Sequence, residues 1–266
     1  MTDVSKVVAQ WRLETAPKSI SEWHRRVDKF FYDFFCHEMT TDNRPVSSEN
    51  VQQAYEHRSV TNFTGEISTI YALRNCEDVL RYTVNSLARG TSISPEMVQR
   101  FNRLIVYNVL DEVKYSKYGE RPGEYKKKLY RFGENQYGSS PEKVPALLED
   151  ILRFMRDSQS DPLKVAAVSH CMFERVHPFP QGNGRTGRIL LNYYLLSKDF
   201  PPIIFFSEDE KEYLAALKMF DNDGLSTKQM YDYLAKSLAK TWDSVTIDSD
   251  TNYELNMLHA LEVLEV

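Results

Sequence analysis

Apolar residues recur every three or four positions over several stretches of this chain, which is the spacing of one face of an α-helix. Residues 161–177 fit a helix that ends at His177, and the apolar run 189–196 has the composition of a buried helix. Bulky residues within 23–34 and leucines within 255–264 are also spaced as on one helix face, typical of core packing in the first case and of a short amphipathic segment in the second. The pattern therefore predicts a mainly α protein.

Capping side chains support these helices. Ser94, Ser140 and Asp161 each stand directly before a proline. A short polar side chain can accept a hydrogen bond from the first turn of a helix, and proline suits its first position. We therefore expect helices to begin at these three places.

One segment, residues 128–139, favours a β-structure instead. Tyr130, Phe132 and Tyr137 surround two glycines there, as in a short hairpin. The alternative is an aromatic-rich connecting loop. Residues 126–128 and Arg131 are basic, and indicate either attraction of an acidic partner or an ordinary solvated face.

Composition limits the class of protein. The chain has 266 residues, 42% of them hydrophobic and 27% charged, and a net charge of −5, which predicts no nucleic-acid partner. The sequence contains no apolar stretch long enough for a membrane span, so we expect no membrane association, and its start lacks the layout of a secretory signal. The three cysteines, Cys36, Cys76 and Cys171, are odd in number and irregularly spaced, which predicts reduced thiols and a cytoplasmic protein.

The strongest indication of function lies in residues 177–188, His-Pro-Phe-Pro-Gln-Gly-Asn-Gly-Arg-Thr-Gly-Arg. A glycine-rich loop that leads into a helix presents backbone N–H groups and a positive dipole end to a phosphate. Arg185 and Arg188 are three residues apart and can reach the same anion. His177, with an ordinary pKa near ~6.5, suits proton transfer at neutral pH. Phe179 is expected to anchor the loop in the core.

This segment closely resembles the signature of the Fic family, H-x-F-x-[D/E]-G-N-G-R-x-x-R, and matches seven of its eight defined positions. The resemblance covers roughly residues 93–240. It implies a Fic-type helical bundle with a short β-hairpin flap that docks a target segment beside the site. We divide the chain into an N-terminal helical region (1–92), a Fic core domain (93–240) and a C-terminal tail with a short helix (241–266).

The resemblance also implies an activity, that of a protein adenylyltransferase, which transfers AMP from ATP to a Ser, Thr or Tyr hydroxyl of a target protein. His177 would be the catalytic base, and the nucleotide would be bound by Gly182, Asn183, Gly184, Arg185 and Arg188. ATP would be the co-substrate, with Mg²⁺ or Mn²⁺. Asn183 would either contact phosphate or shape the loop, and it could also simply occupy a left-handed turn.

Gln181 departs from the family, which has Asp or Glu there to hold the metal. An amide oxygen is a weaker ligand for Mg²⁺ than a carboxylate, so Gln181 is only a weak candidate metal ligand. Two alternatives to the transferase therefore stay open: a nucleotide-binding regulator with an impaired metal site, and a transferase of another phosphate-containing group.

Many Fic proteins carry an inhibitory glutamate, in the pattern [S/T]-x-x-x-E-[G/N], that pairs with the second arginine of the motif. The chain has no strict match. Glu66 is the nearest candidate by location, although the pattern fails on both sides of it and an ordinary surface glutamate is the simpler interpretation. The alternatives are an antitoxin-like partner protein that supplies the glutamate, or no inhibition at all.

Overall fold

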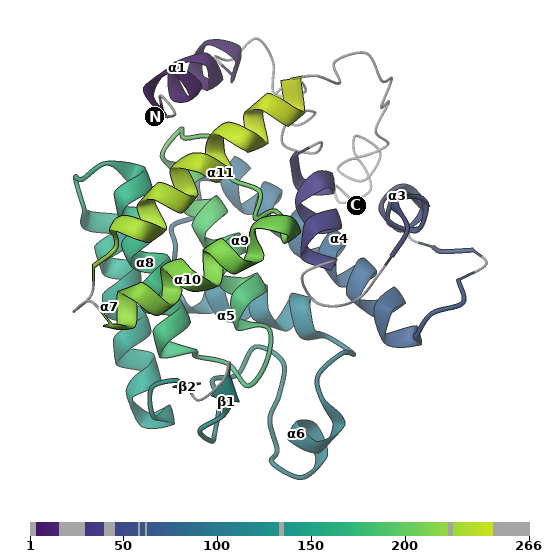
Figure 1. Cartoon of the computed structure of the whole chain (residues 1–266). Helices are drawn as coiled ribbons and strands as arrows, with labels where there is room; N and C mark the ends of the chain where they lie inside the picture. The colour runs from purple at the N-terminus through teal and green to yellow at the C-terminus, as the bar shows by residue number, and fades with distance from the viewer. Residues whose placement is uncertain are drawn as a thin grey trace.

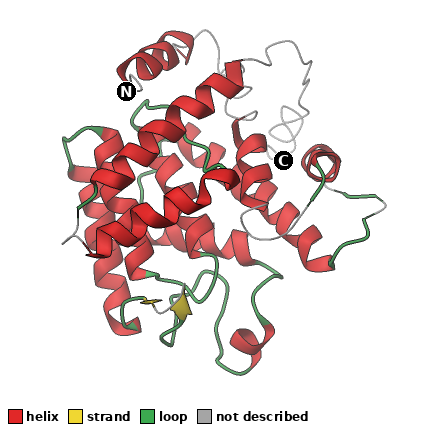
Figure 2. Cartoon of the chain, in the orientation of Figure 1, coloured by secondary structure: helices red, strands yellow, loops and turns green. Residues whose placement is uncertain are grey.

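The computed structural model describes residues 4–15, 30–39, 46–57, 59–61, 63–132, 136–222 and 226–246. Helices make up most of this part of the chain, with one small sheet (Figure 2). The predicted mainly α class with a short hairpin is therefore confirmed.

The helices follow one another with mostly short connections (Figure 1). They are α1 (Val4–Thr15), α3 (Ser48–His57), α4 (Ile67–Ala88), α5 (Pro95–Val106), α6 (Glu112–Ser116), α7 (Val144–Asp157), α8 (Pro162–Val176), α9 (Asn183–Ser197), α10 (Glu210–Asn222) and α11 (Lys228–Thr246). Residues 30–39 are also helical. Single turns of 3₁₀-helix, Pro141–Lys143 and Ser207–Asp209, precede α7 and α10.

The α9 helix forms the centre of the bundle. It packs against α8, α5 and α4, and nearly all of its residues from Asn183 to Leu195 are buried. A helix that is enclosed on every side needs apolar residues around its whole circumference, which explains the apolar run 189–196, interrupted only by Asn192. Its first two turns nevertheless carry two arginines, Arg185 and Arg188, and this exception marks the site.

Local signals predicted where two helices begin. The Ser94 hydroxyl accepts a hydrogen bond from the Met97 N–H (3.3 Å), and the Asp161 carboxylate accepts one from the Lys164 N–H (3.1 Å). Ser140 precedes the 3₁₀ turn before α7, but its side chain makes no capping bond. The α8 helix ends at Val176, one residue before the end at His177 that the periodicity predicted.

The predicted hairpin consists of β1 (Arg131–Phe132) and β2 (Gln136–Tyr137). The strands are antiparallel, with Arg131 opposite Tyr137 and Phe132 opposite Gln136. We call this hairpin the flap. It extends from the end of the molecule at which α8 gives way to the loop before α9.

The first ninety residues contribute core as well as surface. Phe30, Phe31 and Phe34 are at most 1% exposed, as their spacing predicted. The Trp11 ring meets the Trp242 ring edge-on, with the ring centroids 4.8 Å apart, and this contact joins α1 to α11. Trp23 and Val27, which completed that pattern, lie outside the described residues, as does the amphipathic segment 255–264. The α11 helix crosses residue 240, where the sequence suggested a domain boundary.

Among the helices that are described, none combines the length and the apolar character that crossing a membrane requires.

Candidate active site

His177 occupies an unusual backbone position at the end of α8. Its φ and ψ are 50° and 62°, in the left-handed region that few residues other than glycine and asparagine adopt. Its N–H still donates to the Phe173 carbonyl (2.9 Å), so it completes the last turn of the helix. The left-handed conformation turns the chain sharply into the loop that leads to α9.

The loop between α8 and α9 is held by its own side chains. Asn183 accepts a hydrogen bond from the Phe179 N–H and donates one to the Phe179 carbonyl, both at 2.8 Å. Phe179 is fully buried, as expected for an anchor. Because both polar atoms of the Asn183 side chain are used in this way, the loop-shaping interpretation of Asn183 is the one that agrees with the geometry.

Gly182 closes the loop and caps α9. Its φ is +77°, and a Cβ atom there would lie 2.6 Å from Cγ1 of Val106. Both its conformation and the close packing therefore exclude any larger residue. The first N–H groups of α9 have no partner within the helix and point out of its N-terminus, as the anion-binding interpretation of the motif requires.

Asn102, a buried residue of α5 that the sequence did not single out, joins this loop to a distant segment. Its amide donates to the Gln181 carbonyl (2.8 Å) and the Thr186 hydroxyl (3.2 Å), and accepts from the Gly123 N–H (3.1 Å). An asparagine inside an amphipathic helix gives no signal of its own. Only the folded chain brings its partners to it.

The imidazole of His177 packs against the flap. The rings of His177 and Phe132 are parallel, with an interplanar angle of 3° and centroids 4.0 Å apart. Burial under this ring lowers the pKa of His177 to about 4, and the positive charges of Lys126 and Lys114 act in the same direction. The Glu174 carbonyl opposes the shift, although it lies outside hydrogen-bond geometry with the buried Nδ1. The imidazole is therefore neutral at pH 7 and able to accept a proton.

Arg188 is already paired. Its Nε and Nη2 donate to the two carboxylate oxygens of Glu38, at 2.5 and 2.7 Å, and both residues are almost completely buried. Glu38 belongs to the helical segment 30–39, 150 positions earlier in the chain. Its carboxylate raises the pKa of Arg188 above its already high value, against the effect of burial.

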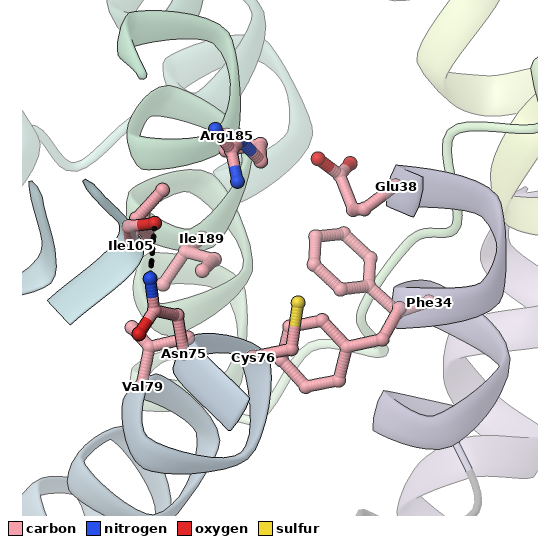
Figure 3. Close-up of a pocket in the computed structure, with 9 residues that line it drawn as sticks. Phe34, Glu38, Asn75, Cys76, Val79, Ile105, Arg185 and Ile189 are labelled. Carbon is pink, nitrogen blue, oxygen red and sulfur yellow. Dashed lines mark hydrogen bonds between the residues drawn. The ribbon is translucent and has the colours of Figure 1, made fainter. Parts of the chain in front are cut away.

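Arg185 lies across a small pocket from Glu38 (Figure 3). Phe34 and Cys76 contribute to the apolar part of the pocket, and Asn75 donates from its edge to the Ile105 carbonyl (3.1 Å). The carboxylate of Glu38 thus lies among the arginines of the motif, at a place where they would otherwise face an anion.

Glu66, the candidate inhibitory residue from the sequence, is elsewhere. It is exposed at the N-terminus of α4, where its carboxylate accepts a hydrogen bond from the Ser68 hydroxyl (3.1 Å). The glutamate that meets the second motif arginine is Glu38, so the choice of Glu66 is corrected. The sequence missed Glu38 because Phe34 and Met39 occupy the positions at which the inhibitory pattern has Ser or Thr and Gly or Asn.

Gln181 is engaged with the segment that follows α5. Its amide oxygen accepts from the Asp111 N–H and its amide nitrogen donates to the Val109 carbonyl, both at 3.0 Å. Lys114 adds a bond from its ammonium to the Pro180 carbonyl (2.7 Å). The side chain that was a weak candidate for a metal ligand therefore fastens residues 109–111 to the loop.

A second buried carboxyl group lies behind the motif. Burial raises the pKa of Glu174 to about 7, with Glu38 acting in the same direction and Arg188 against it. His170 is also buried, shares a 2.8 Å hydrogen bond with the Tyr213 hydroxyl, and has its pKa lowered to about 3. His170 therefore packs as a neutral residue, and no cluster of three potential metal ligands occurs in the described part of the chain.

Part of the chain is similar in sequence to known proteins. Residues 92–195 match the model of the Fic/DOC family. "Protein adenylyltransferase fic-1" of Caenorhabditis elegans is 43% identical over 81 residues, which make up 29% of this chain and 16% of that protein. A "Probable protein adenylyltransferase" of Aquifex aeolicus is 35% identical over 97 residues, 36% of this chain and 30% of that protein. The matched part is thus less than a third of either relative.

Solved structures share the fold over almost the whole chain. A Fic domain containing signaling protein of Bacteroides thetaiotaomicron superposes with a TM-score of 0.76 at 21% identity, over 91% of this chain and 94% of that one. Fic-1 of C. elegans (residues 134–508) superposes with a TM-score of 0.74 at 24% identity, over 92% of this chain and 72% of that one. At these identities the similarity concerns the fold alone.

Proposed function

The chain belongs to the Fic family, and on this premise we propose that it is a protein adenylyltransferase held in an inhibited state by its own Glu38. The observation that carries the proposal is the position of His177, buried and neutral, at one end of a loop whose other end is the α9 N-terminus with Arg185 and Arg188. A base and a phosphate-binding helix end on one short loop suit phosphoryl chemistry.

His177 has the role of general base. Its neutral imidazole takes the proton from a Ser, Thr or Tyr hydroxyl of the target. The hydroxyl oxygen then forms a bond to the α-phosphorus of ATP as the bond to pyrophosphate breaks. Most of the rate enhancement comes from holding the two reactants in line and from stabilising phosphate charge, because this chemistry asks for little else from the protein.

The backbone at Gly182, Asn183 and Gly184 supplies the N–H groups that face the phosphates. Asn183 contributes through the loop shape, since its side chain is bonded to Phe179. Arg185 and Arg188 neutralise phosphate charge, with Arg188, one turn into α9, at the distal phosphate.

The metal that the family uses fits this chain poorly on the protein side. Gln181 is uncharged, and both of its amide atoms bond to the backbone of residues 109–111. We derive no role for a metal from the side chains here. Mg²⁺ or Mn²⁺ would enter with the triphosphate, held by phosphate oxygens and water, and would neutralise their charge when bound.

Glu38 explains why activity would be low in the isolated chain. A carboxylate that receives two hydrogen bonds from Arg188 occupies the arginine that the triphosphate needs. Buried ion pairs are costly to break when one partner is left alone, so nucleotide must both displace Glu38 and replace its charge. The inhibitor therefore belongs to the same chain, and no antitoxin-like partner is required.

The experiment compares wild type with Glu38→Gln, using α-labelled ATP, Mg²⁺ or Mn²⁺, and a lysate as the source of targets. We expect weak label on protein with wild type and strong label with Glu38→Gln, together with tighter ATP binding by calorimetry. Glu49→Gln, on the exposed face of α3, is the matched control and should behave as wild type.

Three results would contradict all or part of the proposal. ATP binding by Glu38→Gln without any transferred label would favour the nucleotide-binding regulator instead. Label from γ-labelled but not α-labelled ATP would favour transfer of a different phosphate-containing group. Equal ATP affinities for wild type and Glu38→Gln would remove the inhibitory role of Glu38 while leaving the transferase open.

The remaining parts of the proposal concern surroundings. The partner is a protein that offers a hydroxyl side chain beside the flap. A reducing compartment such as the cytoplasm is supported by Cys36, Cys76 and Cys171, none of which forms a disulfide.

A further inference from the structure

Lys126 lies on the chain just before the flap and is only 2% exposed, although its neighbours Lys127 and Lys128 are solvated. The interpretation of residues 126–128 as a solvated basic face is therefore wrong for Lys126. Burial of an ammonium group requires compensation by hydrogen bonds, and the direction of those bonds shows what the residue does.

The partners of Lys126 are the carbonyls on either side of the catalytic turn. Its Nζ donates to the His177 carbonyl (2.8 Å) and to the Val176 carbonyl (3.1 Å), and its backbone N–H donates to the Pro178 carbonyl (3.0 Å). Three successive carbonyls are thus held by one residue. Two of them end α8, where the helix dipole places partial negative charge.

Gly138, just after the flap, packs against the Lys126 ammonium and the turn at His177. A Cβ atom at Gly138 would lie 2.4 Å from Nζ of Lys126 and 2.7 Å from Cβ of His177. The Ser139 N–H also donates to the Val176 carbonyl (3.0 Å). Both ends of the flap are therefore fastened to the turn that carries the histidine, with the ammonium between them.

We propose that Lys126 is a positioning residue for the adenylyl transfer. Its buried ammonium fixes the left-handed turn at His177 and disfavours protonation of the imidazole, which would place a second positive charge beside its own. This inference rests on the proposed function for the role of His177. The contacts themselves do not depend on the identity of the reaction.

The charges around His177 agree with this role. Burial is the first cause of its lowered pKa, Lys126 is the second, and Lys114 on α6 acts in the same direction. The flap offers the uncharged ring of Phe132, and α8 offers the Glu174 carbonyl, which opposes the shift. Burial also lowers the pKa of Lys126 itself to about 8, so that it is mostly charged at pH 7.

Three variants separate the proposed role from packing alone. Lys126→Met keeps an unbranched buried chain but removes charge and donors, Lys126→Arg keeps both, and Lys127→Met is the control, since Lys127 bonds to the Gly119 carbonyl and Glu124 and not to the turn. Two measurements are made on each: the His177 titration by NMR without nucleotide, and kcat and KM for transfer in the Glu38→Gln background.

For Lys126→Met we expect the His177 pKa to rise toward its ordinary ~6.5 and kcat to fall about 10²-fold, with KM for ATP little changed. Lys126→Arg should recover most of both properties, and Lys127→Met should match the parent. An unchanged His177 titration in a folded Lys126→Met would overturn the electrostatic role. Equal loss in the Met and Arg variants would reduce Lys126 to a packing residue.

The NMR titration also keeps this test separate from the proposed function. If no variant transfers label but His177 titrates as expected, the transferase proposal fails and the positioning of His177 by Lys126 stands.

Discussion

The acid–base behaviour of this site is decided at a single residue, His177. Its left-handed backbone, the parallel ring of Phe132 and two nearby ammonium groups act together on one imidazole. Burial beneath Phe132 and the two ammonium groups favour a neutral ring, while the turn and the stacked ring fix its orientation. As the proposed base, such a ring is deprotonated over a wide range of pH. The same low pKa means that it binds the proton that it must accept only weakly.

Replacing His177 should therefore affect the rate more than binding. In the Glu38→Gln background, His177→Ala should lower transfer by ~10²–10⁴-fold, the usual contribution of a general base, and leave ATP affinity nearly intact. Single-turnover rates and calorimetry measure the two effects. His57→Ala, an exposed histidine that ends α3, is the control, and a His177→Ala protein with the parent rate would show that another group is the base.

The pH dependence of kcat/KM tests the state of the imidazole. A base works when deprotonated, so activity should persist above the pKa of His177 and disappear as pH falls through it. With that pKa lowered to about 4, the profile should be flat between pH 6 and 5, where an ordinary histidine would already lose activity. An acid limb near ~6.5 would mean that burial by the flap does not persist in solution.

Elements rather than residues hold the loop between α8 and α9. The α5 helix reaches it through Asn102, the segment after α5 through Gln181, and the segment before the flap through Lys126. The loop is thus fastened on three sides by parts of the chain that lie far from it in sequence. This explains how the loop that ends in Gly182 can keep one shape.

Gln181→Glu tests one of these fastenings. The new carboxylate can still accept from the Asp111 N–H, but it faces the Val109 carbonyl without a proton to donate. We expect the free energy of unfolding at pH 7 to fall by about 1–3 kcal/mol, and to recover at low pH where the carboxyl group is protonated. Urea unfolding at the two pH values measures this.

The same variant bears on the metal. A charged oxygen should increase the apparent Mg²⁺ affinity in transfer assays, because carboxylates are better ligands than amides. Gln181→Met, which loses both hydrogen bonds and gains no charge, separates the two effects. If Gln181→Glu changes neither stability nor metal dependence, position 181 matters to neither loop nor metal.

Local signals in the sequence were enough to predict α8, the loop that follows it and the start of α9. The caps at Ser94 and Asp161, the helical spacing and the motif each depend on neighbours within a few positions. Residues whose partners are distant gave no comparable signal. Asn102 was one polar residue in a helix, and Lys126 looked like part of a surface charge run.

Glu38 shows most clearly where prediction from local sequence signals ends. Its role depends on a contact 150 residues away, and the flanking Phe34 and Met39 do not match the pattern by which such glutamates are recognised. Glu66 was the nearest candidate by its location before the core, although an ordinary surface glutamate was the simpler interpretation. In space the helical segment 30–39 is the one that reaches Arg188.

At the scale of the whole molecule, the N-terminal helices and the residues that match the Fic/DOC model share one hydrophobic interior. Phe34 packs in the same core cluster as Ile189 of α9, and Trp11 of α1 meets Trp242 of α11. The residues proposed to inhibit the site and those proposed to perform the chemistry are therefore parts of one packed body. Loss of packing among the N-terminal helices should therefore lower the stability of the helices that carry the site, and the reverse.

Trp11→Ala should lower the free energy of unfolding by about 3–5 kcal/mol, as expected for deleting a large buried aromatic. Trp242→Ala should cost a similar amount, and the double variant less than the sum, because the two rings are each other's partners. Urea denaturation of the four proteins measures the coupling. Additive losses would mean that the contact between the two rings contributes nothing of its own.

The pairing of Glu38 with Arg188 also has a kinetic consequence. In its proposed role as an inhibitor in the same chain, Glu38 acts at a fixed effective concentration, typically of millimolar order for tethered groups, which dilution of the protein cannot reduce. The onset of activity is then a first-order event, the departure of one carboxylate from one guanidinium, and its rate is the same at nanomolar and micromolar enzyme. ATP can speed the switch to the active state only by occupying Arg188 after Glu38 has left. The rate at which the Glu38–Arg188 pair opens therefore sets an upper limit on how fast each molecule can become active.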